Sequence, residues 1–354
     1  MWQRPSHFHA VARALLLSLG LLLGLCGCAN TSQQRFDFTR VVMGVQARIS
    51  LYAPSESSAE RAAANAFALL AQIEEETSDY RVDNSVARLA TRAGTQQWTP
   101  IGPHLTQVLE HSLRLTSESA GVFDPTMGPL THLWRSQRQS PGTIVSDTDI
   151  ANAIHLVNWK HIEISGDQVR LLTKGMKVDF GAIAKGYAAE CAVRELSRHC
   201  VPRSLVSIAG DVFAGSPPPG SKGWHVAVQA GQSPTADSQI ADAWIELSDA
   251  GCSTSGDVEQ VITVGGRRQS HIIDIRTGRG SDRRRSVTVI APTGWQSDAL
   301  ATILYLIDDA QAQRILDRHP GTRAIIFDRI ESNGQVQLRK REIKSAAVRM
   351  SETR

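Results

Sequence analysis

The stretch "SVTVIAPTGWQSDALATILYLI", Ser286 to Ile307, decides how the chain is interpreted. Its opening β-branched residues predict a strand, and an apolar run of helical length follows the Pro-Thr-Gly turn. Asp298 and Thr302 interrupt this run. Four residues apart on a helix, they share one face and can reach one ligand. Alternatively, Asp298 is only the N-cap of its helix and Thr302 bonds back to a carbonyl one turn earlier. These residues alone favour the cap.

The rest of the chain predicts short strands joined mainly by hairpins, with helices in separate blocks. This order indicates an α+β fold with a largely antiparallel sheet and flanking helices, and not a βαβ array. We expect one domain over residues 28–354. Helices are predicted at 57–76, 103–121 and 184–196, a hairpin at 161–172, and strands at 45–53, 176–180, 204–210, 224–228, 258–264, 270–275, 286–291 and 323–327.

Residues 1–27 have the proportions of a signal peptide, with two arginines ahead of an apolar run too short to span a bilayer comfortably. "LCGC", Leu25 to Cys28, resembles a lipobox, so we expect a lipoprotein with its anchor on Cys28. An uncleaved N-terminal helix is the alternative. Ala29 follows the cysteine, which leaves both inner and outer membrane open. The expected location is the periplasmic face of the cell envelope.

Charge and cysteine content exclude some functions. The formal net charge of +3 includes both signal-region arginines, so the mature chain is close to neutral and no nucleic-acid partner is expected. Three cysteines follow the signal region: Cys191, Cys200 and Cys252. An odd number leaves at least one free thiol, although Cys191 and Cys200 are able to pair. The basic tail "LRKREIKSAAVRMSETR" predicts a solvated or mobile end.

The glycine-rich segment "VDFGAIAKGYAAE", Val178 to Glu190, has two glycines at phosphate-loop separation. It is not a P-loop, because Lys185 precedes the second glycine and Tyr187 follows it. A strand end, flexible glycines, a helix N-terminus and a lysine still make a good anion site. A plain strand-to-helix turn is equally compatible with these residues.

Further polar clusters stand where such a turn can meet them. Tyr80 follows a long helix, Phe123 and Asp124 precede a proline, Asp211 follows a small-residue turn, and His271 lies in "HIIDIRTG". Each alone has an ordinary structural explanation, since aromatic residues are usually core and aspartates beside glycine or proline usually make turns.

Taken in order, these segments resemble the family of FAD:protein FMN transferases, the ApbE-type flavin-transfer lipoproteins. The resemblance extends from Met43 to Thr302. It rests on "MG" at Met43, "SDYRVDNSVARL", "GVFDPTMGPL", "VDFGAIAKGYA", "IAGD", "TSGD", "SHIIDIRTG" and "SVTVIAPTGWQSDALAT".

The resemblance implies a T-fold-like single domain, FAD as substrate and an acceptor flavoprotein of a membrane respiratory complex as partner. It also implies a magnesium ion held by Asp298, Thr302 and the carbonyl of Ala182. Hard oxygen ligands at this spacing suit Mg²⁺, so the metal interpretation now outweighs the cap. The FAD site implied by the resemblance comprises Met43, Tyr80, Val122, Phe123, Asp124, Asp179, Lys185 and Ile272 or its neighbour His271.

Four positions depart from the family pattern. Val45 replaces a threonine, Asp79 a small or hydroxyl residue before the tyrosine, Ala209 a glycine, and Ile275 a proline. The alanine is a small change unless that backbone needs a positive φ. None of the four removes a predicted ligand.

Three hypotheses for function follow. The first is Mg²⁺-dependent transfer of FMN from FAD to a threonine hydroxyl of the acceptor, releasing AMP; the second is an exported FAD pyrophosphatase; the third is a flavin-binding lipoprotein without catalysis. Lys185 and the metal would neutralise phosphate charge in the first two. His271 is the candidate base, because histidine titrates near neutrality, and Asp257 is a weaker one. The alternative, in which His271 only contacts flavin and is not the base, is nearly as well supported.

Overall fold

The computed structural model describes residues 33–139, 145–228, 243–256, 261–264, 267–332 and 335–352. Cys28 with the signal region, and Asp257, lie outside these residues. The main feature is an eight-stranded sheet in the order β1-β2-β6-β7-β10-β15-β16-β17, in which every neighbouring pair is antiparallel. The expected α+β fold with a large antiparallel sheet and flanking helices is confirmed.

The strands of the large sheet are β1 Gln34–Val42, β2 Val45–Ala53, β6 Ser204–Ile208, β7 Asp211–Ala214, β10 Ala250–Gly256, β15 Arg285–Ala291, β16 Arg323–Ser332 and β17 Gln335–Lys344. Smaller sheets contain β3 Thr99–Pro100, β4 Ile162–Ser165, β5 Gln168–Leu171, β8 Trp224–Val228, β9 Ala243–Leu247, β11 Val261–Val264, β12 Arg267–Ser270, β13 Ile273–Asp274 and β14 Arg279–Gly280. The helices are α2 Glu56–Thr77, α3 Ser85–Arg92, α4 Pro103–Glu118, α5 Gly128–Gln139, α6 Asp147–His155, the 3₁₀ turn Trp159–His161, α7 Ala184–Arg198, α8 Gly294–Leu306, α9 Asp309–Leu316 and α10 Ala346–Glu352.

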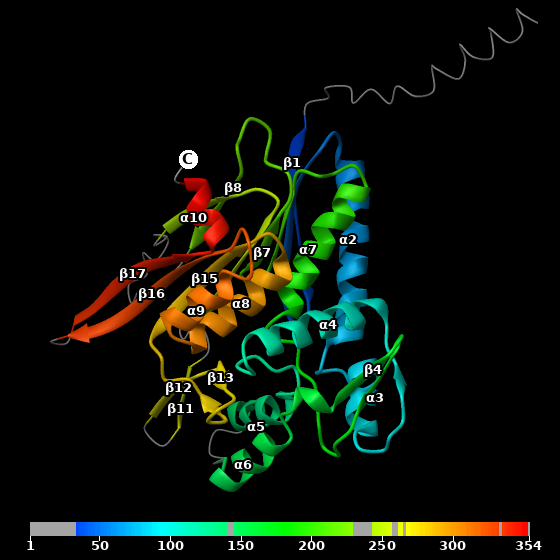
Figure 1. The fold of residues 1–354 in the computed structure, drawn as a ribbon. Helices are drawn as coiled ribbons and strands as arrows, with labels where there is room; N and C mark the ends of the chain where they lie inside the picture. Colours follow the sequence, from blue (N-terminus) through cyan, green and yellow to red (C-terminus); the bar gives the residue numbers. More distant parts are fainter. Residues whose placement is uncertain are drawn as a thin grey trace, which may run out of the picture.

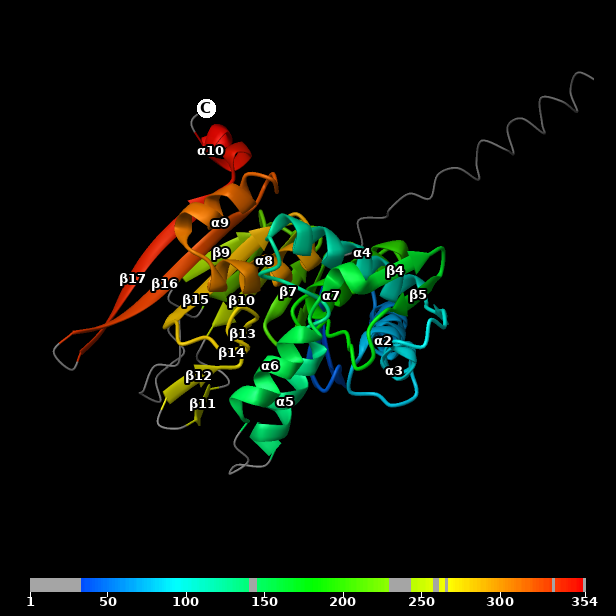
Figure 2. The same cartoon turned by 60° about the horizontal axis from the view of Figure 1, so that its bottom comes forward.

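Helices α2, α7 and α8 cover one face of the sheet in the same order as the strands beneath them. Helix α2 contacts β1 and β2, α7 contacts β6 and β7, and α8 contacts β10 and β15 (Figure 1). Helices α5 and α6 and strands β11 to β14 lie together beyond one end of this layer, as Figure 2 shows from below. The polar segments that the sequence singled out meet at this end.

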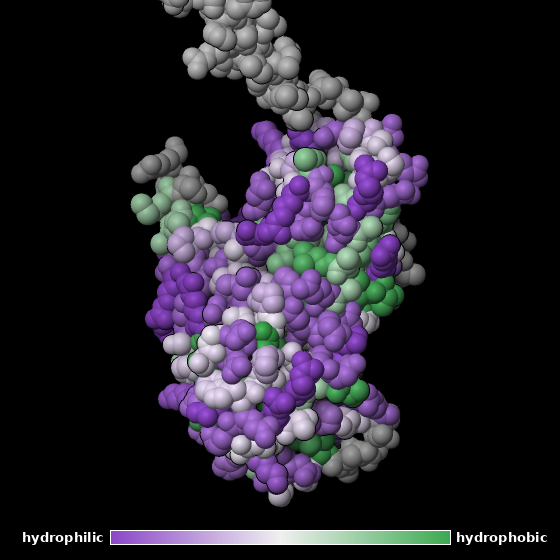
Figure 3. All heavy atoms as spheres, turned by 90° about the vertical axis from the view of Figure 1, so that its right-hand side faces the viewer, coloured by the Kyte–Doolittle hydropathy of each residue, from purple (hydrophilic) through white to green (hydrophobic). Residues whose placement is uncertain are grey.

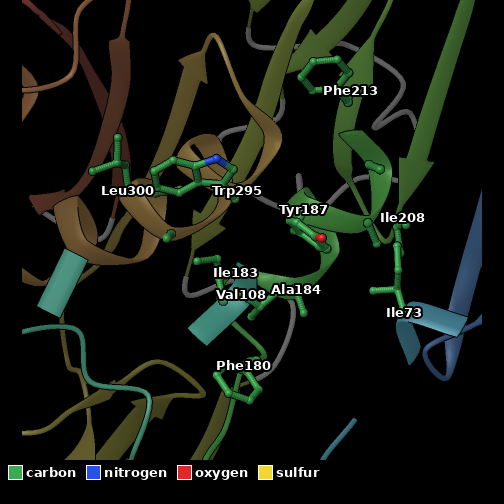
Figure 4. Packing of buried hydrophobic residues seen from close by; sticks show 14 of the residues in the cluster. Ile73, Val108, Phe180, Ile183, Ala184, Tyr187, Ile208, Phe213, Trp295 and Leu300 are labelled. Atoms are coloured by element: carbon green, nitrogen blue, oxygen red, sulfur yellow. The ribbon is translucent and has the colours of Figure 1, made fainter. Parts of the chain in front are cut away.

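The main core lies between the helices and the sheet. Trp295 of α8, Tyr187 of α7 and Phe213 of β7 all belong to it (Figure 4). On the opposite face of the sheet a second core forms where the β8–β9 hairpin packs, with Trp224 and Leu247 against Ile290 and Phe327. The side of the molecule seen in Figure 3 is mainly hydrophilic with separate apolar areas, as expected for an outer layer of amphipathic helices.

Two glycines allow α7 and α8 to cross at backbone contact. A Cβ atom at Gly186 would lie 2.1 Å from the carbonyl oxygen of Gly294, and a Cβ atom at Gly294 would lie 2.1 Å from the carbonyl oxygen of Gly186. No residue other than glycine fits either position without displacing a helix.

Two hairpin turns of the large sheet each place one non-glycine residue in the left-handed region. Met43 (φ 54°) and Gly44 (φ 70°) form the two-residue turn between β1 and β2, as a type I′ hairpin requires. Ala209 (φ 48°) and Gly210 (φ 91°) form the turn between β6 and β7. The departure from glycine at Ala209 therefore falls on a backbone that needs a positive φ.

Several expectations were wrong in detail. The strand predicted at 176–180 is only an isolated bridge between Lys177 and Met127. The strand predicted at 270–275 is divided between β12 and β13 by His271 and Ile272. The basic tail, predicted to be solvated or mobile, is mainly exposed, but it forms edge strand β17 up to residue 344 and then α10.

Two further points concern the cysteines and the membrane. Cys191, Cys200 and Cys252 are free thiols, so the possible Cys191–Cys200 pair does not form. Within the part of the chain that the structure describes, no helix has the length and apolar character needed to cross a bilayer.

We expect Gly186→Ala to lower the free energy of unfolding by about 3 kcal/mol, because the new methyl group overlaps the Gly294 carbonyl in a packed interior. Denaturant unfolding measures this change. Gly166→Ala is the control: Gly166, unlike Gly186, has a positive φ (59°), but nothing lies within 4 Å of its Cβ position, so only backbone strain of about 1 kcal/mol is expected. Equal losses in the two variants would contradict the steric explanation.

Ala209→Gly is expected to raise the free energy of unfolding by about 1 kcal/mol, because glycine removes the cost of the left-handed backbone. Ala64→Gly, at an exposed position inside α2, should instead lower it by about 1 kcal/mol. Calorimetric or denaturant melts of both proteins give the two signs, and a loss of stability in Ala209→Gly would refute the assignment of strain.

Candidate functional site

The contact between α7 and α8 brings Lys185 and Asp298 together. Asp298 Oδ2 accepts a hydrogen bond from the backbone N–H of Gly186 at 2.9 Å. Lys185 Nζ lies 3.8 Å from the same oxygen and 3.0 Å from Asp211 Oδ2. It also donates to the carbonyl oxygen of Gly181 at 3.0 Å. The glycine contact thus assembles one lysine and two carboxylates from three separate segments.

Asp298 caps a helix, but not its own. The N-cap of α8 is Thr293, so Asp298 stands inside that helix and the N-cap interpretation is wrong. The N-cap of α7, Ile183, has no side-chain cap, and Asp298 accepts from the N–H group of Gly186 in its first turn. The carboxylate at this helix N-terminus is therefore the chain's own Asp298, and binding of a ligand anion at this turn stays a prediction.

The charges in this cluster do not balance. Asp298 and Asp211 are 4% and 5% exposed, and Lys185 is the cation between them. Burial, and next the charge of Asp211, raise the pKa of Asp298 to about 7 against the opposing effect of Lys185. Burial disfavours the charge on Lys185, but Asp211 and Asp298 outweigh it and raise the lysine's pKa, so Lys185 stays protonated at neutral pH. When both carboxylates are ionised, one surplus negative charge remains in the cluster, which a bound cation would neutralise.

The residues present fit a magnesium ion. Thr302 lies one helical turn after Asp298 on α8, and its hydroxyl hydrogen-bonds with Ser255 Oγ of β10 at 3.0 Å. A carboxylate, a hydroxyl and the nearby carbonyl of Ala182 are hard oxygen donors, and Mg²⁺ takes its remaining ligands from water and phosphate. No cluster of three or more His, Cys, Asp or Glu side chains suited to a metal occurs among the described residues.

A cavity of about 220 Å³ opens beside this cluster. Its walls come from the turn after α2, the loop before α5, helix α5 itself, the turn before α7, the segment from the end of β12 to the start of β13, and α8. Thr302 and Ala182 line it, which places the cavity next to the carboxylate cluster. The other predicted site residues along its wall are Tyr80, Val122, Phe123, Asp124, Asp179, His271 and Ile272.

The remaining predicted residues lie elsewhere. Met43 is in the β1–β2 turn, where its N–H donates to Glu74 Oε2 at 2.7 Å, and it does not line the cavity. Lys185 and Asp298 adjoin the cavity through Gly181 and Thr302. The ligand-binding roles assigned by resemblance stay predictions for all of these residues.

Asp124 also has a structural role. Its Oδ1 accepts from the N–H and hydroxyl of Thr126 at 2.8 and 2.6 Å, and its Oδ2 accepts from the N–H of Trp159 at 3.2 Å. Burial raises the pKa of Asp124 in spite of these bonds. The carboxylate therefore ties the loop that carries Phe123 to the 3₁₀ turn.

Sequence reasoning missed Arg135 and gave Asp211 no role. Arg135 of α5 donates to Asp79 and to Asp179, and its guanidinium carbon lies 4.1 Å from the centroid of the Tyr80 ring. Asp79, one of the four departures, thus has an arginine partner. The sequence signal that pointed to such an arginine was Asp79, an aspartate beside the predicted ligand-binding residue Tyr80. A buried aspartate of this kind implies a cation from another segment.

The ApbE family model matches residues 43–327. A Klebsiella pneumoniae (strain 342) protein named FAD:protein FMN transferase is 30% identical over 314 residues, which cover 86% of this chain and 89% of that relative. An Escherichia coli (strain K12) protein of the same name is 30% identical over 247 residues, 68% of this chain and 69% of the relative.

Solved structures agree with the fold. The apo form of the flavinyl transferase ApbE from Pseudomonas stutzeri superposes with a TM-score of 0.75 at 26% identity, and covers 90% of this chain and 97% of that one. The flavin transferase ApbE from Vibrio cholerae has a TM-score of 0.75 at 21% identity, over 90% and 99% of the two chains, and supports the fold alone.

Mg²⁺ affinity is expected to rise with pH and then level off above about 7, because below that pH the metal must displace a proton from Asp298. Each unit below the pKa should cost up to about tenfold in affinity. Calorimetric titration at about pH 6 and about pH 8 measures the effect. Thr302→Val should weaken Mg²⁺ binding but keep its pH dependence, whereas Asp298→Asn should lose both the binding and the pH dependence. Equal wild-type affinities at the two pH values would show that Asp298 is already ionised at the lower one, and unchanged affinity in Asp298→Asn would exclude it as a ligand.

Proposed function

The chain belongs to the ApbE family of flavin transferases, and we propose that it transfers the FMN half of FAD to a threonine hydroxyl of an acceptor flavoprotein and releases AMP. One observation carries the proposal: the lysine–carboxylate cluster around Asp298 adjoins the cavity that collects the predicted flavin contacts. A charged site for phosphate chemistry beside a partly apolar cavity suits a substrate with a pyrophosphate and a planar ring system.

Mg²⁺ would be held by Asp298, Thr302 and the Ala182 carbonyl, where it would neutralise pyrophosphate charge. Lys185 supplies a permanent positive charge, because its pKa is raised and it cannot serve as a proton donor near neutral pH. The bonds of Lys185 to Asp211 and Gly181 fix its ammonium group between the cluster and the cavity. These residues stabilise the charge on the transferring phosphoryl group.

In the proposed reaction the threonine oxygen of the acceptor attacks the phosphorus of the FMN half. A new P–O bond forms, the P–O bond to the AMP half breaks, and AMP leaves with the bridging oxygen. The hydroxyl proton passes to a base. His271 is exposed and lines the cavity, and histidine is the side chain most often used as a general base, so we assign it this role. Asp257, the weaker candidate, lies outside the described residues.

The flavin contacts are proposed on the cavity wall. Tyr80, Phe123 and Ile272 offer aromatic and apolar surface to the ring system, and Val122 adds to it. Asp179 and Asp124 offer polar atoms at the same wall. Met43 remains proposed on resemblance alone.

We place the protein at the periplasmic face of the cell envelope, with a lipid anchor on Cys28 after removal of residues 1–27. The proposed acceptor is a flavoprotein of a membrane respiratory complex. A lipid anchor would hold the enzyme at the membrane surface that carries such an acceptor.

Mass spectrometry tests the proposal with the chain from Ala29 onward, FAD, Mg²⁺ and a threonine-bearing acceptor domain. We expect an acceptor heavier by one FMN moiety, together with free AMP. Asp298→Ala should reduce turnover by about 100-fold or more, because a group that holds charge-stabilising metal is lost. An acceptor with its threonine replaced by valine is the matched control for the attachment site.

Other products would overturn the transfer assignment. Free FMN and AMP with an unmodified acceptor would indicate the pyrophosphatase, and intact FAD with binding retained would indicate a flavin-binding protein. Unchanged turnover in Asp298→Ala would remove the metal assignment while leaving the reaction class in place.

A further inference from the structure

Arg135 of α5 joins two carboxylates from distant parts of the chain. Its Nη1 donates to Asp79 Oδ2 in the turn after α2, and its Nη2 donates to Asp179 Oδ2 in the turn before α7 at 2.9 Å. The side chains of Arg135, Asp79 and Asp179 are 17%, 18% and 7% exposed. Because both arms of the planar fork are engaged, the orientation of the guanidinium plane is fixed.

The fixed guanidinium supports an exposed aromatic ring. Its central carbon lies 4.1 Å from the centroid of Tyr80, within the range of a cation–π contact. Tyr80 is 72% exposed, so little else packs against its ring. Tyr80 and Arg135 both line the cavity beside the Lys185 cluster. The ring therefore has a cation behind it and open surface in front of it.

The same bridge reaches the turn that carries Lys185. The second carboxylate oxygen of Asp179 accepts from the N–H of Gly181 at 2.7 Å, and the carbonyl of Gly181 accepts from Lys185 Nζ at 3.0 Å. Loss of Arg135 would release Asp179 on one side and Tyr80 on the other. The two ends of the cavity are thus connected through one side chain.

We propose that Arg135 is a positioning residue that holds Tyr80 as a stacking platform for the planar ring system of the flavin substrate. The proposal rests on the proposed function only for the identity of the ligand. The arrangement is a three-layer stack of guanidinium, phenol ring and flavin ring. The charge of Arg135 is already offset by its two carboxylates, so we assign it a role through Tyr80 and not as a phosphate ligand.

Replacement of Arg135 by lysine separates the effect of its charge from the effect of its shape. Arg135→Lys keeps the positive charge and can pair with one carboxylate, but it loses the planar fork and the flat surface under the ring. If Arg135 contributes only its charge, FAD binding should survive the substitution. If it supports the Tyr80 ring, FAD binding should weaken.

The experiment measures FAD binding without acceptor, through the quenching of flavin fluorescence, for the wild type, Arg135→Lys, Tyr80→Ser and the double variant. We expect each single variant to bind FAD about tenfold more weakly and to lose most of the quenching. If Arg135 acts through Tyr80, the double variant should be within about twofold of Tyr80→Ser. Asp79→Asn, which keeps the Arg135–Asp179 pair, should show a partial loss.

Arg341→Lys is the matched control. Arg341 of β17 also bridges two carboxylates, those of Asp309 and Asp328, and is 20% exposed, but it lies on a hairpin away from the cavity. It should bind and quench FAD as the wild type does, and its melting temperature shows what loss of a bridging arginine costs in stability alone.

Two results would overturn the proposal: wild-type FAD affinity in Arg135→Lys, or independent effects that multiply to about a hundredfold in the double variant. Because no acceptor is present, failure of the transfer reaction leaves this measurement unaffected.

Discussion

The approach of α7 to α8 at Gly186 and Gly294 is the constraint on which the site depends. With a side chain at either position the helices would separate, and Asp298 would lose the N–H group of Gly186. That hydrogen bond also brings Asp298 to Lys185, one residue before Gly186. Close packing, helix capping and charge placement are therefore satisfied by a single crossing. Gly294, which the sequence indicates as part of a Pro-Thr-Gly turn, is in fact a residue at which two helices make contact.

The cluster formed by this crossing is held at an electrostatic cost. Two buried carboxylates share one lysine, and Asp298 is neutral for part of the time near pH 7. A chain selected for stability alone would replace one carboxylate with an amide or an apolar residue. The strained backbone at Ala209 lies two residues before Asp211, which is the other carboxylate of the cluster. Both features are understandable if the cluster is kept for a cation and an anionic substrate.

Sequence reasoning succeeded where the pattern was local. Helices α2, α4 and α7 and strands β2, β8 and β15 follow from periodicity, caps and turn residues. It failed where contacts between distant segments determine the structure. The segment at 176–180 places Met176, Val178 and Phe180 in the main core but pairs through only one bridge. Strands β1 and β17 are edge strands whose polar residues conceal their pairing. Arg135 was missed for the same reason, since its partners come from two segments that only the fold brings together.

The size of the cavity limits how much of the substrate it can enclose. Sites that enclose a ligand of ordinary size measure about 300–1,000 Å³, and this cavity measures about 220 Å³. A dinucleotide therefore cannot lie wholly inside it. In the proposed binding mode one half occupies the wall around Tyr80 and Phe123. The pyrophosphate then extends over Gly181 and Ala182 toward Lys185. Binding energy from ring stacking is then gained at one end and charge stabilisation at the other. The bridge from Tyr80 through Arg135 and Asp179 to the Lys185 turn fixes the spacing between these two ends, which is the geometric requirement of phosphoryl transfer.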